Sequence, residues 1–516
     1  MNIATHSPAL IIAIPLLGAF LTPLIGKLGR RVRDAFVLII LILTSIIGII
    51  LAQQVYSEGV VEYVFGGSSP SINSSTTSSI PIVRIIFEID GMSIFMAMIS
   101  LLLAFFAALY SISFVKDENG SDRYYTLLLL LLVGMLGMEL TGDMFNFFVF
   151  IEIASISASA LIAFSVDRGE SLEAAIKYLA ISSIGALFLL FAIGLLYGQY
   201  DALNMAMIAN SLSNTYIDKI ALILLIGSLA MKSGIAPMHM WMPDAYGEAP
   251  SSVTFAIIAA TQASLYGLIR VCFTIYGKAF DMQAIAGVLV ALAFASIFIG
   301  ATMTLIQSSL TRAIAYAAVA EMGYILLGIG TALFLGVEAH GAVALKGGIF
   351  HIFNDALDMG LLFLAAGSII YATKERNMNN LGGLARRMRF TTIFFLIGLL
   401  AASGMPPMNG FASKILIYES TYTLNPILAI IAILSSILML AIFVRIFYSV
   451  FLGPENPNLK DIKEVPKPML ISMACISLII ILFGIFPSLV VDSIVNPAVH
   501  ALSNVDAYIG SILGGV

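Results

Sequence analysis

The sequence predicts an all-α integral membrane protein with about fourteen transmembrane helices. Of its 516 residues, 60% are hydrophobic and only 11% are charged, and the mean hydropathy is +1.02. Soluble proteins carry about 25% charged residues, so this composition indicates a membrane protein. Apolar runs of about 20 residues, long enough to cross a bilayer as a helix, recur along the chain. These runs show no alternation of polar and apolar residues, which excludes the strands of a membrane barrel.

Fourteen such runs are present, and glycine and proline residues interrupt two of them, at 219–244 and 390–415. The others lie at 8–25, 35–52, 92–114, 124–141, 144–166, 174–197, 252–277, 282–306, 313–335, 341–371, 425–452 and 468–495. We expect the first run to be a retained helix, because no basic residues precede it as in a signal peptide. The predicted sections are three N-terminal helices (1–114), two five-helix repeats (124–277 and 282–452), and a last helix with its tail (468–516).

The distribution of basic residues predicts the orientation of these helices. The odd-numbered connections hold sixteen Lys and Arg residues, whereas the even-numbered connections hold three, Arg84, Lys219 and Lys278. Cytoplasmic connections are the basic ones, so both termini are expected outside the cell membrane. The Ser/Thr-rich loop 66–79 is then expected on the outer side, as a mobile segment without chemistry of its own.

Composition also limits the kinds of partner and cofactor. The net charge of −5 is small and thinly spread, so no nucleic-acid partner is expected. The two cysteines, Cys272 and Cys475, lie far apart, without the Cys/His spacing of a metal or iron–sulfur site. No phosphate-binding glycine motif follows a predicted strand. We therefore expect neither a metal, nor a cofactor, nor a catalytic site within this chain.

The stretch 229–250, LAMKSGIAPMHMWMPDAYGEAP, combines an intramembrane charge with a helix break. Pro237 lacks an N–H donor and clashes with the preceding turn, which predicts that the helix breaks there. Lys232 lies at the break, and a lysine near the bilayer centre costs about 2.5–3.5 kcal/mol. Such residues usually mark ion pathways, although a lysine at a helix end can also extend its amine to the membrane surface.

The two interrupted runs belong to a predicted inverted repeat. The motif SGIAPM at 233–238 recurs as SGMPPM at 403–408, an offset of 170 residues. Nearly the same offset relates Glu152 to Glu321 and Lys177 to Lys346. Five helices in each copy make the second copy inverted relative to the first. Paired broken helices in inverted repeats place the working site near the midplane.

Glu152 and Lys232 form the predicted functional pair of the first repeat. Glu152 lies in FNFFVFIEIASISASALIAF, with apolar residues on both sides, so a charged carboxylate there requires a cationic partner. If Lys232 is that partner, a proton that reaches either group loosens the pair, as in a proton relay. The alternative is a purely structural ion pair between the two helices.

Further ionisable and polar residues lie in the second repeat and in the run 252–277. His351, Asp355 and Asp358 fall on one face of a helix. Gln262, Tyr266 and Arg270 form a polar stripe that we expect to link the two halves. The remaining candidates are Lys346, Glu321 and Lys414. Sequence spacing alone does not show whether these side chains touch.

Long motifs show a resemblance to a known family. The chain resembles the antiporter-like subunits of Mrp-type cation/proton antiporters, respiratory complex I and membrane-bound hydrogenases. It is most similar to the Mrp D type, which includes the subunits of archaeal hydrogenase and sulfane reductase complexes. The motifs that carry the resemblance are TGDMFNFFVFIE (141–152), KSGIAPMHMWMPDAYGEAPSS (232–252), LTRAIAYAAVAEMGY (310–324), HIFNDALDMGLLF (351–363) and LGGLARRMRFTTIFFLIGLLAASGMPPMNGFASK (381–414).

The resemblance implies roles for four of the candidates. Glu152, Lys232 and Lys414 match the glutamate and the two lysines of the family's translocation line, and His351 matches the first histidine of its motif.

The chain also departs from the family pattern. Gln262 and Met359 replace usual lysines, Asp355 and Tyr246 replace usual histidines, and Glu321 stands where histidine or glutamine is common. These departures put the central lysine bridge in question: either Asp355, Asp358, Glu321 and water replace it, or conduction through the chain is weakened.

We therefore predict an ion-translocating subunit of a larger membrane complex, either an antiporter or an oxidoreductase such as a hydrogenase or a sulfane reductase. Its expected partners are other membrane subunits, lipid, and H⁺ or Na⁺ as the transported ion. Two alternatives stay open at this point, namely a scaffold subunit that does not conduct and a stand-alone solute transporter.

Overall fold

A computed structural model describes residues 4–65, 85–115, 120–337 and 340–513. Within these ranges, twelve helices are long and apolar enough to cross a membrane. They are α1 (Ser7–Gly26), α2 (Arg30–Glu58), α3 (Gly91–Phe114), α4 (Ser121–Leu140), α5 (Met144–Ile162), α6 (Gly169–Tyr200), α10 (Ser251–Ile269, extended by the π-helical turn η2, Arg270–Ile275), α11 (Gln283–Ile306), α12 (Leu310–Leu335), α13 (Gly341–Thr373), α16 (Pro426–Phe447, extended by η5, Tyr448–Leu452) and α17 (Lys467–Ile485). The predicted multi-pass, all-α membrane fold is confirmed.

Both predicted helix breaks are present. The first break follows α8 (Tyr216–Lys232), and the chain resumes as η1 (Met238–Trp241) and α9 (Met242–Glu248). The second separates α14 (Arg389–Ala402) from α15 (Asn409–Leu424). Gly234 and Gly404, 170 residues apart, turn the chain at the two breaks with φ of 68° and 69°, a conformation that glycine adopts without strain. Because α8 and α14 are shorter than the twelve spans, the count of fourteen and the five-helix repeats stay predictions.

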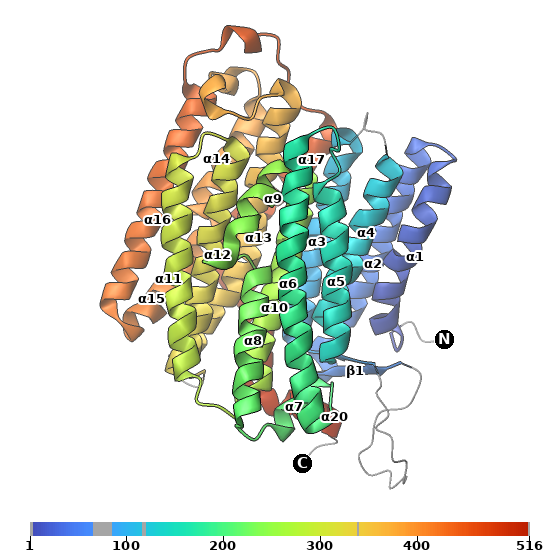
Figure 1. The fold of residues 1–516 in the computed structure, drawn as a ribbon. Coiled ribbons are helices and arrows are strands. Elements are labelled where there is room, and N and C mark those ends of the chain that lie inside the picture. The colour runs from blue at the N-terminus through green and yellow to red at the C-terminus, as the bar shows by residue number, and fades with distance from the viewer. Residues whose placement is uncertain (1–3, 66–84, 116–119, 338–339, 514–516) are drawn as a thin grey trace.

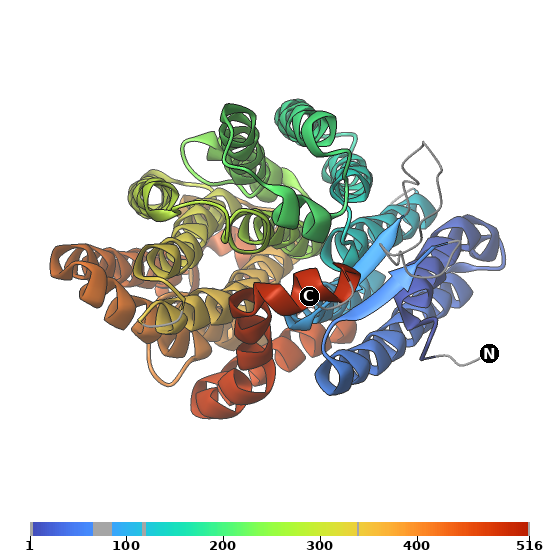
Figure 2. The same cartoon turned by 90° about the horizontal axis from the view of Figure 1, so that it is seen from below.

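The helices run side by side along one axis (Figure 1). Seen along that axis, α1 and α2 lie at one end of an elongated bundle, and α15 and α16 lie at the other (Figure 2). The centre is α10, which packs against α3, α4, α8 and α13, and every residue of its membrane-spanning part is buried. Residues on α10 therefore contact both halves of the bundle.

One face of the bundle, which we call the C-terminal face, carries several short elements that the apolar pattern did not predict. They are the antiparallel strands β1 (Val61–Val64) and β2 (Ile86–Ile89), and the helices α7 (Met205–Ser211), α18 (Pro487–Val490), η7 (Val491–Val495), α19 (Asn496–Ser503) and α20 (Val505–Leu513). Helix α20 lies across this face near its middle (Figure 2). Short 3₁₀ turns, η3 (Met378–Asn380), η4 (Leu384–Arg386) and η6 (Pro457–Leu459), lie in connections.

The predicted boundary of the last span was wrong. The apolar run 468–495 predicted one helix, but α17 ends at Ile485 and the chain turns before Pro487. Proline cannot donate the backbone hydrogen bond that would continue the helix, so a new helix starts at Pro487 instead. The predicted mobile loop 66–79 lies outside the described residues, as do Arg84 and Lys116 of the basic-residue count.

Helix α17 packs closely against the second break at Gly484. We therefore predict that Gly484→Ala lowers the melting temperature of the chain. A Cβ atom at Gly484 would lie 2.6 Å from the Met408 carbonyl carbon and 2.7 Å from the Asn409 nitrogen, so α17 or the break must move. Such overpacking typically costs about 1–3 kcal/mol. Thermal unfolding of the purified chain in detergent measures the effect.

Gly194→Ala is the matched control, because nothing lies within 4 Å of a Cβ atom at this position in α6. Alanine is favoured over glycine inside a helix by about 0.5–1 kcal/mol, so the control should melt at the same temperature or slightly higher. Equal melting temperatures for the two variants would contradict the close approach of α17 to the break.

Candidate functional site

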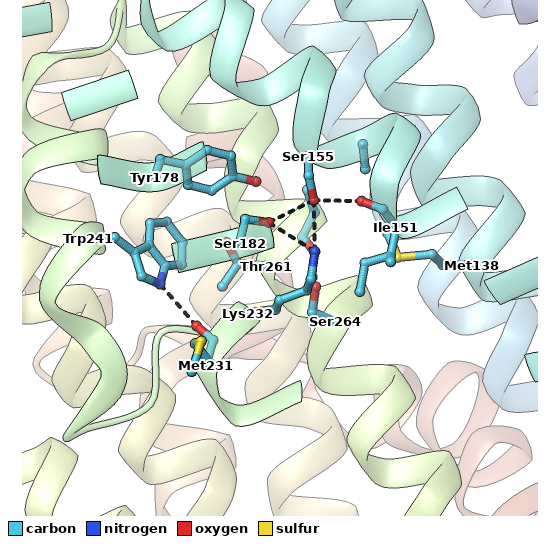
Figure 3. Close-up of a pocket in the computed structure, with 12 residues that line it drawn as sticks. Met138, Ile151, Ser155, Tyr178, Ser182, Met231, Lys232, Trp241, Thr261 and Ser264 are labelled. Carbon is cyan, nitrogen blue, oxygen red and sulfur yellow. Dashed lines mark hydrogen bonds between the residues drawn. The ribbon is translucent and has the colours of Figure 1, made fainter. Parts of the chain in front are cut away.

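Lys232 and Glu152 lie together in the structure. Lys232 is the last residue of α8, and its Nζ lies 3.3 Å from Oε1 of Glu152 on α5. The ammonium also donates to the hydroxyls of Ser155 and Ser182, at 3.0 and 2.9 Å (Figure 3). The side chain of Lys232 is 3% exposed, whereas that of Glu152 is 29% exposed. The lysine is therefore enclosed, and the glutamate reaches the surface of the bundle.

A small cavity of about 20 Å³ adjoins the Lys232 ammonium. Polar groups from three helices line it, namely Ser155 of α5, Ser182 of α6, and Thr261 and Ser264 of α10 (Figure 3). A cavity needs about 10–15 Å³ and two to four polar partners to hold a water molecule, so this one fits a single water. A single water molecule in this cavity could bridge the Lys232 ammonium and the hydroxyl groups on the central helix α10.

Gln262, next to Thr261 on α10, contacts the second half of the bundle. Its Nε2 donates to Oδ2 of Asp355 at 2.9 Å and to the carbonyl of Ile352 at 3.0 Å, both on α13. Gln262 and Asp355 are both buried. Helix α10 therefore contacts both sites: its residues Thr261 and Ser264 line the cavity beside Lys232, and Gln262 binds the buried carboxyl group of Asp355 on α13.

Glu321 on α12 is the centre of a second buried charge cluster. Its two carboxylate oxygens lie 2.9 Å from Nζ of Lys414 and 3.0 Å from Nε2 of His351. Nδ1 of His351 lies 2.9 Å from the hydroxyl of Ser413. The ammonium of Lys414 lies 4.3 Å from the centre of the Tyr324 ring, a cation–π contact. Three predicted site residues, Glu321, His351 and Lys414, therefore share one set of contacts.

The two lysines reach equivalent places by different routes. Lys232 ends α8, whereas Lys414 lies on α15, beyond the second break. Lys414 nevertheless extends back across the break and donates to the carbonyl of Ala402, the last residue of α14, at 2.7 Å. Ala402 is 170 residues after Lys232, the offset of the repeated motif. Both broken helices therefore end at a lysine residue or a lysine ammonium: Lys232 is the last residue of α8, and the ammonium of Lys414 binds the last carbonyl of α14, where a cation is favoured.

Comparison with known proteins identifies the family. Residues 141–439, more than half of the chain, match the family described as NADH:quinone oxidoreductase/Mrp antiporter, transmembrane. The chain belongs to this family. It is an antiporter-like membrane subunit, as the motifs predicted, and the matched segment includes Glu152, Lys232, Glu321 and Lys414.

Individual relatives match almost end to end. The chain is 29% identical to NADH-quinone oxidoreductase subunit N of Desulforudis audaxviator, over 96% of this chain and 98% of that protein. It is 28% identical to the D component of the Na⁺/H⁺ antiporter of Bacillus subtilis, over 97% and 98%. Its fold matches a chain of the archaeal membrane-bound sulfane sulfur reductase, with a TM-score of 0.87, 30% identity and coverage of 98% and 99%. Similar proteins are thus subunits of membrane complexes.

Two further predicted residues of this antiporter-like subunit form no ion pair with any residue that the structure describes. Asp358 is buried on α13, and its Oδ1 has no hydrogen-bond partner in the part of the chain that the structure describes. Lys346 lies half-buried near the start of α13, and it forms no ion pair or hydrogen bond with any described residue. The structure therefore does not bring Lys346 into contact with His351 or Glu321.

Sequence reasoning missed other buried carboxylates. Glu139, near the end of α4, and Glu88, on β2, are completely buried. Asp90 precedes α3 and pairs with Arg270, which the sequence analysis had placed in a polar stripe without a partner. Glu139 carries the same signal that identified Glu152, an acidic residue inside an apolar run, and could have been found by it.

Ion pairs from both halves hold α9, which follows the first break. Glu248 accepts from Arg168, at 2.6 Å, and from Arg376, at 3.1 Å. Asp244 pairs with Lys177, at 2.7 Å, and with Arg312, at 3.3 Å. Burial and the charge of Arg168 lower the pKa of Arg376, which lies outside the spanning helices. Lys177, the repeat counterpart of Lys346 in the sequence, belongs to this cluster.

Proposed function

We propose that this subunit translocates protons along a line of buried side chains near the middle of the membrane. The line runs from Glu152 and Lys232, through the small cavity and Gln262, to Asp355, and on to the cluster of the second half. Its members are Glu152, Lys232, Gln262, Asp355, Asp358, His351, Glu321 and Lys414. Lys346 is left out because it has no partner in the described part of the chain.

The observation that carries this proposal is the hydrogen bond between Gln262 and Asp355. The family usually has a lysine at position 262, so its absence put the connection between the two halves in question. Gln262 cannot ionise, but its amide joins α10 to a buried carboxyl that can accept and release a proton. The connection then depends on Asp355 together with water, and not on a third lysine.

The Glu152–Lys232 pair acts as the switch in this proposal. While Glu152 is charged, it stabilises the ammonium of Lys232 in a nearly dry site. A proton that reaches Glu152 neutralises it and leaves Lys232 with hydroxyl partners only. The enclosed lysine then favours release of a proton to the water cavity. Reprotonation of Lys232 and loss of the proton from Glu152 restore the pair.

Other membrane subunits are the proposed partners, because the relatives belong to multi-subunit complexes. Redox chemistry or an ion gradient in such a complex would drive the switch, and the surface exposure of Glu152 allows a neighbouring subunit to affect it. We place the chain in the cell membrane with both termini outside, and its exposed apolar side chains in lipid. Two relatives are named as subunits of Na⁺/H⁺ antiporters, so Na⁺ is the alternative transported ion. A buried lysine paired with a glutamate in each half favours translocation over a scaffold role.

Asp355→Asn tests the connection between the halves. In a reconstituted complex that carries this chain, the variant should keep the hydrogen bond from Gln262 but lose the titrating group, so proton uptake into vesicles should fall. We expect a loss of about a hundredfold or more, because a positioned proton-transfer group typically contributes about 10²–10⁴-fold to a rate. Asp461→Asn, in an exposed loop, is the control and should transport normally. Equal proton uptake by both variants would mean that the second half does not conduct.

A further inference from the structure

The C-terminal face contains a pocket that is separate from the proposed line. Its volume is about 340 Å³, and it lies between the end of α2, the start of α3, and the helices α19 and α20. Asp90, His500, Asn504, Ala507 and Tyr508 are among its lining residues. Asp90 is itself buried, so the pocket connects the surface with a carboxylate in the interior.

Asp90 forms a fully buried ion pair at the inner end of this pocket. Nη2 of Arg270 donates to its Oδ1, and the side chains of Arg270 and Asp90 are only 1% and 4% exposed. Two aromatic rings contact the guanidinium, whose carbon lies 5.2 Å from the centre of the Tyr266 ring and 4.8 Å from that of Tyr508. Oδ2 of Asp90 has no hydrogen-bond partner among the residues described. Tyr508 on α20 lines the pocket and also contacts the guanidinium, so it lies where the pocket meets the ion pair.

Polar contacts continue from this ion pair toward the centre of the bundle. Nε of Arg270 donates to the hydroxyl of Tyr266 at 2.9 Å, and that hydroxyl donates to the backbone carbonyl of Glu139 at 3.0 Å. Arg270, Tyr266 and Gln262 follow one another at four-residue intervals, so they lie on one face of α10 and its π-helical end. This polar face of α10 therefore extends from Arg270, beside the pocket, to Gln262, which donates a hydrogen bond to Asp355.

Glu139 lies beside this polar face, because its backbone carbonyl accepts from Tyr266, and it follows a residue that lines the cavity of Lys232. Its Oε1 accepts from Ser100 at 2.6 Å, and its Oε2, which is buried, has no partner within the described ranges. The preceding residue, Met138, lines the cavity next to Lys232. A carboxylate with so few partners is costly to keep charged, and an unpaired buried oxygen is usually explained by water or by a proton. These are the properties of a group that carries a proton between two wet sites.

We propose that a proton route connects the pocket at Asp90 with the midplane line, with the Asp90–Arg270 pair as its gate and Glu139 as a proton carrier. It rests on the proposed function, because it supplies that line with access to the C-terminal face. Glu139 accepts one proton from one side and releases one to the other, so its charge is restored in every cycle. A purely structural pair between α3 and α10 would explain the contact of Asp90 with Arg270, but not the pocket or the unpaired oxygens.

The test places a positive charge inside the pocket of the assembled complex. In a background with Cys272→Ala and Cys475→Ala, Ala507→Cys is labelled with a membrane-impermeant methanethiosulfonate that carries a trimethylammonium group. The added cation should repel protons at the entrance and lower proton transport about tenfold, which corresponds to about 1.4 kcal/mol. A reducing agent that removes the label should restore the rate.

Gly510→Cys is the matched control, three residues farther along α20, where nothing lies within 4 Å of a Cβ atom. Labelled to the same extent, it should transport at the unlabelled rate. Full transport by labelled Ala507→Cys would overturn the route. Glu139→Gln, which preserves the shape of the side chain, should also slow transport without a change in melting temperature, and an unchanged rate would remove Glu139 from the route.

Lys232→Ala in the same background separates the two proposals. If this variant loses transport while labelled Ala507→Cys keeps it, only the route through the pocket fails. If Lys232→Ala transports at the normal rate, the midplane line fails, and the route that depends on it fails as well.

Discussion

Lys232→Ala should reduce proton transport by the assembled complex to the level of empty vesicles, while the chain stays folded. The variant removes the side chain that links Glu152 to the small cavity. Protonation of Glu152 then has no neighbouring ammonium from which a proton could be released. The structural cost should be smaller than for a fully enclosed pair, because the Glu152 side chain is 29% exposed at the bundle surface. Proton uptake, followed with a pH-sensitive dye inside reconstituted vesicles, measures the effect.

The control for this variant is Lys460→Ala, which removes an exposed lysine from a connection. It should leave proton uptake unchanged, since an exposed charge contributes little to stability or to a buried path. If Lys232→Ala and Lys460→Ala take up protons equally fast, the broken helix α8 is not the switch.

Lys414→Met should have its largest effect on stability, in contrast to Lys232→Ala. Lys414 and Glu321 are both only 1% exposed, so loss of the lysine leaves a carboxylate in the interior with His351 as its remaining partner. Removal of one member of a buried ion pair typically costs about 3–5 kcal/mol. The melting temperature of the purified chain should therefore fall by several degrees or the chain should fail to accumulate.

A double variant separates pairing from packing at this site. Glu321→Gln combined with Lys414→Met removes both charges, so it should recover much of the stability that Lys414→Met alone loses. Simple addition of the two single effects would show that Lys414 and Glu321 do not stabilise each other, contrary to the 2.9 Å contact.

Much of the fold followed from the sequence because long apolar runs and glycine–proline breaks are local signals. Lys232 was predicted at the end of a helix, and α8 ends there. The elements that escaped prediction are short, such as α7 and α20, and they lie at the bundle surface, where a run of about 20 apolar residues is not required. The last span was predicted too long because the apolar run continues past Pro487, where the helix does not.

The site was predictable as a set of residues but not as a set of contacts. The repeat pointed to Glu152, Lys232 and Glu321, yet the partner of Glu321 depends on how Lys414 reaches back across the second break. Contacts of this kind connect residues far apart in the sequence, and no local pattern encodes them. The link from Gln262 to Asp355, between α10 and α13, was unpredictable for the same reason.

The measurement that tests the central claim most directly is proton uptake together with the driving reaction in one vesicle preparation that carries Glu152→Gln. Glutamine keeps the shape of the side chain but cannot bind or release a proton at neutral pH, so packing is preserved while the switch is lost. We predict that the driving reaction continues and that proton uptake stops. Proton uptake at the normal rate, coupled as in the unmodified complex, would contradict the proposed role of the Glu152–Lys232 pair.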